Sequence, residues 1–272
     1  MKARTAVGCV MVLAATVATA GCSASQVDKA AESVSMIMQR VAHNADGKQS
    51  AQVDFVVDLN GKHVQMSGTY AWGSHAGLDV RMKTAELGMQ ALTSADTVEM
   101  RFVDGAYYYA VGPRSSGPLK GKHWMKVDAS AVFGDASALD SGMQQNPTVG
   151  LDALSASDDA TRIGTETVDG KQTTHYSATV SKSDLSKNSK LFSEQQKGAL
   201  AKYFGGSDSV TTDVWVDGHD LPVRLTEDFG STKVTIDFQS FGGAHPIPVP
   251  PAADTADVSA AVKAKQKAAT TA

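Results

Sequence analysis

Apolar and polar residues alternate with a period of two over much of this chain. In the segment 53–59, Val53, Phe55, Val57 and Leu59 share one phase, and the other phase is mostly acidic. The same alternation runs through residues 78–83, 210–217 and 233–238. Because successive side chains of a strand point to opposite faces, these segments predict a sheet with one apolar and one polar face. Such a sheet is covered on one side only.

Four Asn-Gly or Asp-Gly pairs separate the apolar runs, at residues 60–61, 104–105, 169–170 and 217–218. These pairs suit tight hairpin turns, in which the central residues adopt positive φ. Hairpins join antiparallel neighbours. The pattern therefore predicts antiparallel meanders rather than parallel βαβ units, in one continuous sheet of about nine or more strands.

Three segments carry the signals of helices. Residues 26–40 place their apolar side chains on one stripe. A second helix is expected from Asn146-Pro147 to about residue 156, and a third over about 191–204, ending at Gly205-Gly206. Three helices are too few to cover both faces of a large sheet. We therefore expect a mostly β, α+β fold in which a strongly curved antiparallel sheet carries these helices on its concave face.

The N-terminus has the features of an export signal that ends in a lipid-attachment site. Lys2 and Arg4 precede an apolar run that is too short for a permanent membrane span. Small residues then lead to Cys22, and this arrangement resembles a bacterial lipobox. The sequence predicts a signal peptide over residues 1–21 and an acylated Cys22 that anchors the mature chain to the extracytoplasmic face of the cell membrane.

Ordinary secretion, with cleavage after Ala18 or Ala20, is the alternative. The cysteine count favours lipidation, because the chain has two cysteines and Cys9 would leave with the signal. A lone thiol at Cys22 would be a liability in an oxidising compartment, and acylation removes it. The mature chain can then form no internal disulfide.

The C-terminal segment differs from the rest of the chain. Four prolines between residues 246 and 251 predict an extended exit from the domain. Residues 252–272 contain no aromatic residue and are rich in Ala, Thr, Lys and Asp. We therefore expect one folded domain over residues 22–250 and a disordered tail over 251–272.

Charge and motifs narrow the functional classes. The net charge is −4 and no basic block stands out, so nucleic acid is not expected as a partner. No nucleophile elbow, zinc motif, calcium loop or glycine-rich phosphate loop occurs, and the seven histidines are scattered singly. We expect no enzyme activity, catalytic residue, metal or cofactor.

Methionine recurs in the apolar phase of the predicted strands. It adapts to irregular shapes and is frequent on surfaces that accept variable apolar ligands. An apolar cavity between sheet and helices is therefore one hypothesis, and a plain hydrophobic core built from the same residues is the other. The candidate lining residues are Val57, Met66, Met82, Met100 and Phe102.

Three groups of motifs resemble actinobacterial lipoproteins of the LppX/LprG type. The first is Asn146-Pro147 through Leu154, followed by the hairpin sequence of residues 162–176. The others are the strand 123–128 and the hairpin sequence of residues 214–224. The resemblance covers roughly residues 22–251 and implies a LolA-like fold, a strongly bent antiparallel half-barrel with helices packed into its mouth. It also implies a lipid or glycolipid ligand held between sheet and helices.

Two functions follow as expectations. The first is a lipid-anchored extracytoplasmic carrier that buries the acyl chains of an amphiphile, with a membrane transporter as a further candidate partner. The alternative is a cell-envelope sensor or regulatory lipoprotein that uses the same fold to bind a membrane protein.

Overall fold

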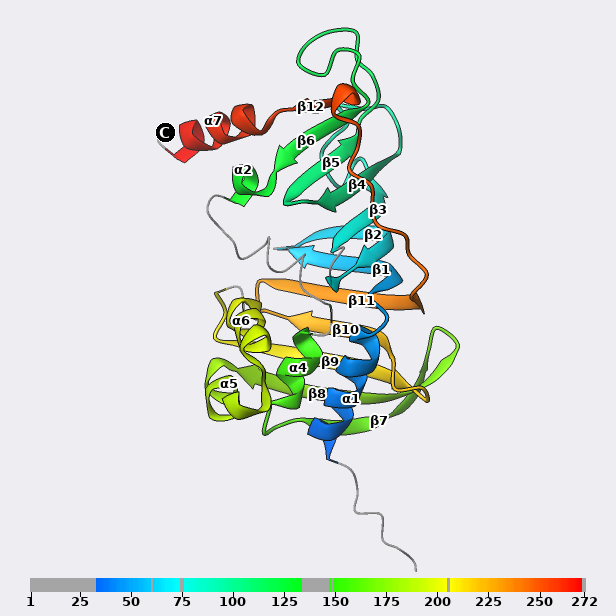
Figure 1. Ribbon diagram of the computed structural model, residues 1–272, viewed down its shortest axis with the longest axis vertical. Helices are drawn as coiled ribbons and strands as arrows, with labels where there is room; N and C mark the ends of the chain where they lie inside the picture. The colour runs from blue at the N-terminus through cyan, green and yellow to red at the C-terminus, as the bar shows by residue number, and fades with distance from the viewer. Residues whose placement is uncertain are drawn as a thin grey trace, which may run out of the picture. The chain divides into compact units, whose positions relative to one another are not determined.

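The computed structural model describes residues 33–59, 61–73, 76–133, 147, 149–204 and 206–270. Its centre is a twelve-stranded, curved, open sheet with the strand order β12-β6-β5-β4-β3-β2-β1-β11-β10-β9-β8-β7 (Figure 1). Every strand pair is antiparallel except β12–β6. The expected fold class, mostly β with one curved sheet, is confirmed.

Two meanders make up eleven of these strands, and β1 pairs with β11 to join them. The first contains β1 (Ser50–Leu59), β2 (Lys62–Ala71), β3 (Gly77–Lys83), β4 (Thr97–Val103), β5 (Ala106–Ala110) and β6 (Trp124–Asp128). The second contains β7 (Thr161–Val168), β8 (Lys171–Ser181), β9 (Ser209–Asp217), β10 (Pro222–Asp228) and β11 (Thr232–Phe241). All four period-two runs therefore fall inside strands.

Three of the four predicted turns lie within the described residues and close hairpins, whereas Asn60 of the fourth lies outside them. Asp104 and Asp169 adopt φ values of 51° and 49°, each followed by a glycine at φ above 70°. This geometry suits the type I′ turn expected from Asp-Gly. The turn at Asp217 is longer, and its carboxylate accepts hydrogen bonds from the backbone N–H groups of His219 and Leu221.

The described residues contain eight helical segments, six α-helices and the 3₁₀ turns η2 (Ser189–Leu191) and η3 (Ala252–Asp254). The α-helices are α1 (Val34–Asp46), α2 (Ala129–Phe133), α4 (Val149–Ser155), α5 (Lys182–Lys187), α6 (Glu194–Tyr203) and α7 (Ser259–Thr270). Helices α1, α4, α5 and α6 lie on one side of the β7–β11 half of the sheet (Figure 1).

Two of the predicted helices have different limits. The helix expected over 26–40 begins at Val34, because Ser33 is its N-cap with extended backbone, and it continues to Asp46. Residues 26–32 lie outside the described part of the chain. In the third predicted helix, Leu191 belongs to η2 and α6 begins only at Glu194. The expected cap Asn146 is also outside the described residues.

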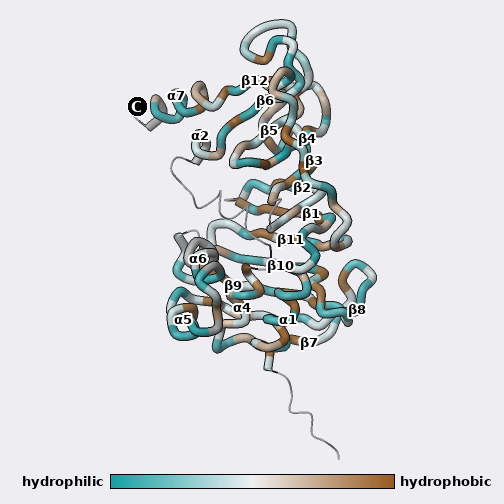
Figure 2. The backbone as a smooth tube through the Cα atoms, in the orientation of Figure 1, coloured by the Kyte–Doolittle hydropathy of each residue, from teal (hydrophilic) through white to brown (hydrophobic). Residues whose placement is uncertain are grey.

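The main core lies between the sheet and the helices. Met38 and Val41 of α1 and Leu151 and Leu154 of α4 are almost completely buried in it. The Ser35 hydroxyl of α1 donates a 2.6 Å hydrogen bond to the Ser155 carbonyl at the end of α4. Figure 2 shows the alternation of apolar and polar residues along the strands that supply the sheet side of this core.

The expectation of a disordered tail is wrong for residues 251–270. After η3, strand β12 (Thr255–Asp257) pairs in parallel with β6, and α7 follows. Lys126 of β6 forms ion pairs with Asp128 and with Asp257 of β12. The backbone of the edge strand β6 offers unpaired groups that β12 satisfies, and local composition does not record such a partner. The expectation of an entirely antiparallel sheet is corrected by the same pair.

Candidate ligand-binding site

The residues predicted to line a cavity lie on one face of the first meander. Met66 of β2 stands opposite Phe55 and Met82 on its two neighbouring strands, and Met100 stands opposite Val80. The structure therefore brings the methionines together with Phe102 in the main core. Val57 lies farther along β1, opposite Val64.

These side chains differ in exposure. Met82, Met100 and Phe102 are 6%, 4% and 1% exposed, whereas Met66 and Val57 are half-buried. Such low exposures mean that the side chains are covered in this conformation. A cavity that these five residues line stays a prediction.

A polar cluster that was not predicted lies under the helices that cover the second meander. Glu227 of β10 follows Val223 and Leu225 in the apolar phase of its strand, so its carboxylate faces the interior. The Tyr203 hydroxyl, at the end of α6, donates a 2.8 Å hydrogen bond to Glu227 Oε1 and lies 3.0 Å from the Thr212 hydroxyl of β9. One acidic residue in an apolar phase is the signal that could have revealed this cluster.

Helix α4 packs tightly against the cluster because it carries a glycine there. A Cβ atom at Gly150 would lie 2.1 Å from Glu227 Oε1 and 3.2 Å from the Tyr203 hydroxyl oxygen. A side chain at position 150 would therefore require the Glu227 carboxylate to shift. Gly150 thus fixes how closely α4 approaches the carboxyl group of β10.

Two carboxyl groups beneath the helices have raised pKa values. Burial raises the pKa of Glu227 to about 7, although the hydrogen bond from Tyr203 favours its charged form. Burial likewise raises the pKa of Asp152 on α4 to about 6, against the lowering effect of its hydrogen bond from Gln196 on α6. Both groups therefore change charge near neutral pH, at the contacts that hold the helices together and to the sheet.

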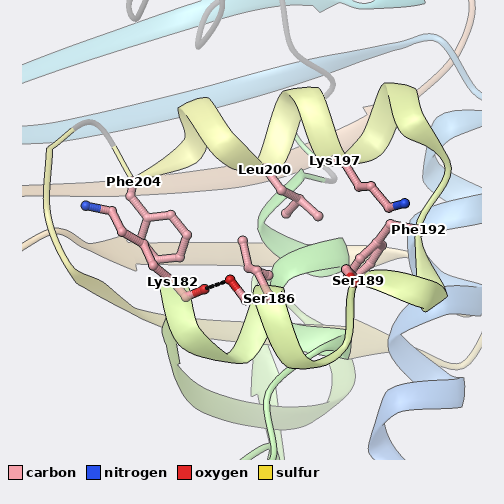
Figure 3. Close-up of a pocket in the computed structure, with 8 residues that line it drawn as sticks. Lys182, Ser186, Ser189, Phe192, Lys197, Leu200 and Phe204 are labelled. Carbon is pink, nitrogen blue, oxygen red and sulfur yellow. Dashed lines mark hydrogen bonds between the residues drawn. The ribbon is translucent and has the colours of Figure 1, made fainter.

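A pocket of about 410 Å³ lies between α5 and α6, and we call it the α5–α6 pocket. Lys182, Leu185 and Ser186 of α5, Ser189 of η2, and Phe192, Lys197, Leu200 and Phe204 of the α6 region line it (Figure 3). Its position was not predicted, because it depends on how two helices meet rather than on either helix alone.

The local sequence explains how the pocket forms. Ser181 caps α5 through a capping box with Asp184, which starts a new helix directly at the end of β8. None of the residues of α5 is buried, so little packing holds this helix against the rest of the protein. Phe192, Leu200 and Phe204 are buried below it and belong to the main core, which also contains Met82, Met100 and Phe102.

The opposite face of the sheet carries polar and aromatic residues that pair with one another. His175 stacks on Trp215 with ring centroids 4.2 Å apart, and its Nε2 lies 2.9 Å from Asp213 Oδ1. The Trp215 indole donates to Glu166. Among the described residues, no group of three or more His, Cys, Asp or Glu side chains is placed to hold a metal ion.

Within the described part of the chain, none of the helices combines the length and the apolar character that crossing a bilayer requires.

The chain is similar to known proteins both in sequence and in structure. No protein-family model matches the chain. An uncharacterised 31.2 kDa protein of Streptomyces griseus, encoded between rplA and rplJ, is 33% identical over 239 residues, which are 81% of this chain and 77% of the relative. A Streptomyces coelicolor protein whose name describes it as a lipoprotein is 30% identical over 183 residues, 64% of this chain and 55% of the relative. The crystal structure of the Mycobacterium tuberculosis lipoprotein LppX is similar with a TM-score of 0.49 and 14% identity, over 79% of this chain and 98% of LppX.

Proposed function

The chain belongs to the same family as the Streptomyces griseus protein, and from its resemblance to lipoproteins of the LppX/LprG type we propose that it binds an amphiphile and buries the apolar part between its sheet and its helices. The observation that carries this proposal is the α5–α6 pocket, whose buried floor belongs to the same core as the methionine-rich face of the first meander. An acyl chain that enters the α5–α6 pocket would meet apolar side chains that belong to one continuous core.

The size of the pocket fits part of an acyl chain. Its volume of about 410 Å³ lies within the usual range of ligand pockets, roughly 300–1,000 Å³. Each methylene group removed from water contributes about 0.8 kcal/mol. A chain longer than the pocket can contribute more only if the cover moves and the methionine face opens.

Helix α5 is the element of the cover that moves at the smallest cost. It has no buried residue, whereas α4 and α1 each bury several. Segments with few buried contacts open at the lowest free energy. Displacement of α5 would widen the α5–α6 pocket and leave the contact between α1 and α4 in place.

Lipidation at Cys22 is the second part of the proposal. This residue lies outside the described part of the chain, and the lipobox-like sequence before it supports the assignment. Two acyl chains suffice for stable attachment to a bilayer, whereas one gives only reversible binding. The protein would then act at the extracytoplasmic face of the membrane that holds it.

Native mass spectrometry of the membrane-extracted full-length protein tests the ligand. We expect the protein to carry, beyond its covalent anchor, a noncovalent lipid that dissociates when the protein unfolds. Protein that carries only its anchor, and that takes up no lipid when mixed with vesicles, would contradict the carrier function.

Substitution of Cys22 by serine tests the anchor. We expect the variant to leave the membrane fraction, because the acyl chains provide the membrane-binding energy. The measurement is the amount of protein in membrane and soluble fractions after a salt wash. A variant that is still membrane-bound after the wash would show that another element anchors the chain.

A further inference from the structure

We propose that the α5–α6 pocket selects amphiphiles whose headgroup carries a negative charge, a carboxylate or a phosphate, and that Lys182 and Lys197 make this selection. The inference rests on the proposed function, because it concerns the ligand of the same site. It adds the chemical class of the headgroup, which the apolar floor cannot discriminate.

The two lysines flank the apolar floor of the pocket. Lys182 lies beside Phe204 at one end and Lys197 beside Phe192 at the other (Figure 3). The Lys182 ammonium group is 6.0 Å from the centroid of the Phe204 ring. Lysine stems lie along apolar surface while their charged ends reach water. A chain that lies on the floor therefore has an ammonium group near its headgroup whichever way it points.

Among the described residues, the ion-pair partners of both lysines are solvent-exposed. Lys182 Nζ lies 3.2 Å from Asp208, whose side chain is fully exposed, and Lys197 Nζ lies 2.6 Å from Glu194, whose side chain is 90% exposed. Ion pairs with such exposed carboxylates contribute little free energy. An anionic headgroup that is held in place by its buried chain can therefore replace Asp208 or Glu194.

The charge around the pocket differs in sign from that of the chain. Residues 182–197 contain four lysines and two acidic residues, whereas the whole chain has a net charge of −4. The segment that forms most of the pocket is thus positive in an acidic protein. Such a local field favours the approach of anions and disfavours cations.

Hydroxyl groups complete the lining. Ser186 of α5 and Ser189 of η2 face the pocket between the lysines and the apolar floor. Ser186 donates its hydroxyl hydrogen to the Lys182 carbonyl within α5, and rotation of the hydroxyl group would direct this hydrogen to a ligand instead. Phosphate and carboxylate oxygens accept hydrogen bonds from hydroxyl groups, so the chemistry of this rim suits both headgroups.

Competition binding to the full-length protein in detergent, with a fluorescent fatty acid as the reporter, tests the selection. The competitors are oleate, oleyl phosphate and methyl oleate, which have the same chain and differ in the charge of the headgroup. We expect the two anions to bind about two- to fivefold more tightly than the ester. In the double variant Lys182→Glu/Lys197→Glu, this preference should disappear while the affinity for methyl oleate changes less than about twofold.

A matched control variant reverses the charge of two lysines outside the α5–α6 pocket. Lys62 and Lys171 are exposed residues outside the pocket lining, and Lys171 stands at the opposite end of β8 from Lys182. The variant Lys62→Glu/Lys171→Glu has the same net charge as the test variant, and we expect it to keep the preference for anions. Equal loss in both variants would show a general charge effect and would overturn the assignment to Lys182 and Lys197.

A third variant tests the location independently of charge. Ser186 is exposed, so Ser186→Trp should fill the α5–α6 pocket without removing a core contact, and it should weaken all three competitors with an unchanged melting temperature. Unchanged binding in this variant would place the site elsewhere. If wild-type protein binds anions and ester equally, the selection is wrong and the carrier function stands; if it binds none of them, the carrier function fails.

Discussion

At the scale of single residues, Glu227 makes the stability of the helical cover depend on pH. Its pKa is raised from about 4.5 to about 7 by burial, so the folded protein favours the protonated form. A raised pKa stabilises the fold fully below the unfolded value, and this contribution is lost as the pH rises through the folded value. The free energy of unfolding therefore falls as the pH rises from about 4.5 to about 7. The raised pKa of Asp152 lowers it in the same direction up to about pH 6.

We expect Glu227→Gln to remove most of this dependence. Glutamine stays neutral and can still accept the hydrogen bond from Tyr203, so the variant should unfold at a higher temperature than wild type at pH 8. The difference should be on the order of 2–3 kcal/mol at pH 8 and small at pH 5. Melting temperatures measured across pH 5–8 test this. Parallel curves for the two proteins would mean that another group titrates.

Gly150 and Gly198 form a matched pair of helical glycines. A Cβ at Gly150 of α4 would collide with the Glu227 carboxylate, whereas a Cβ at Gly198 of α6 would meet nothing within 4 Å. Alanine at Gly198 should stabilise the fold by up to about 1 kcal/mol through helix propensity. Alanine at Gly150 should destabilise it by about 1–3 kcal/mol, because Glu227 must leave Tyr203. Urea unfolding of both variants measures the difference, and similar effects would refute the close contact.

At the scale of elements, β12 protects the edge strand β6. Besides the strand pairing, Val258 donates its N–H to the Lys126 carbonyl, and Ser259 accepts a hydrogen bond from the Asp128 N–H. An uncovered strand edge pairs readily with other chains. We therefore expect a chain that ends at Pro250 to lose stability and to self-associate, as measured by light scattering. A chain that ends at Val258 keeps β12 and should associate no more than the full-length protein; equal association of both truncated chains would assign the protection to α7 instead.

The elements also show where sequence patterns stop being informative. The strands with Val53, Leu78, Val210 and Val234 were predictable, because alternation and the Asp-Gly turns are local signals. The folded structure of the C-terminal segment was not predictable, because its contacts join residues that are 131 positions apart, such as Asp254 and His123. Composition alone suggested a segment unable to fold, and the edge of β6 supplied the missing partner.

The candidate site also has some features that the sequence predicts and others that it does not. Met66, Met82, Met100 and Phe102 were placed on one apolar face by the period of two, and the structure groups them there. The α5–α6 pocket and the contact of Gly150 with Glu227 depend on the placement of helices against each other and against β10. No local pattern records such placements, although the acidic residue in the apolar phase of β10 marked one of them.

At the scale of the whole molecule, the covered methionine face has two alternative roles, to receive a ligand or to fill a core. The two roles respond differently to a larger side chain. Tryptophan at Met100 occupies space that a ligand would need, so in a carrier it should block lipid uptake more than it lowers stability. In a plain core the same change overpacks a well-filled region and costs about 1–3 kcal/mol or more.

Met100→Trp, Met82→Trp and Met36→Trp allow the comparison, since Met36 is 53% exposed on α1 and serves as the control. For each variant, lipid transfer between vesicles is measured beside the melting temperature. We expect Met100→Trp and Met82→Trp to reduce transfer strongly with modest loss of stability, and Met36→Trp to change neither. Normal transfer combined with a collapsed melting temperature would show that these methionines are core, and any bound chain would then be confined to the α5–α6 pocket.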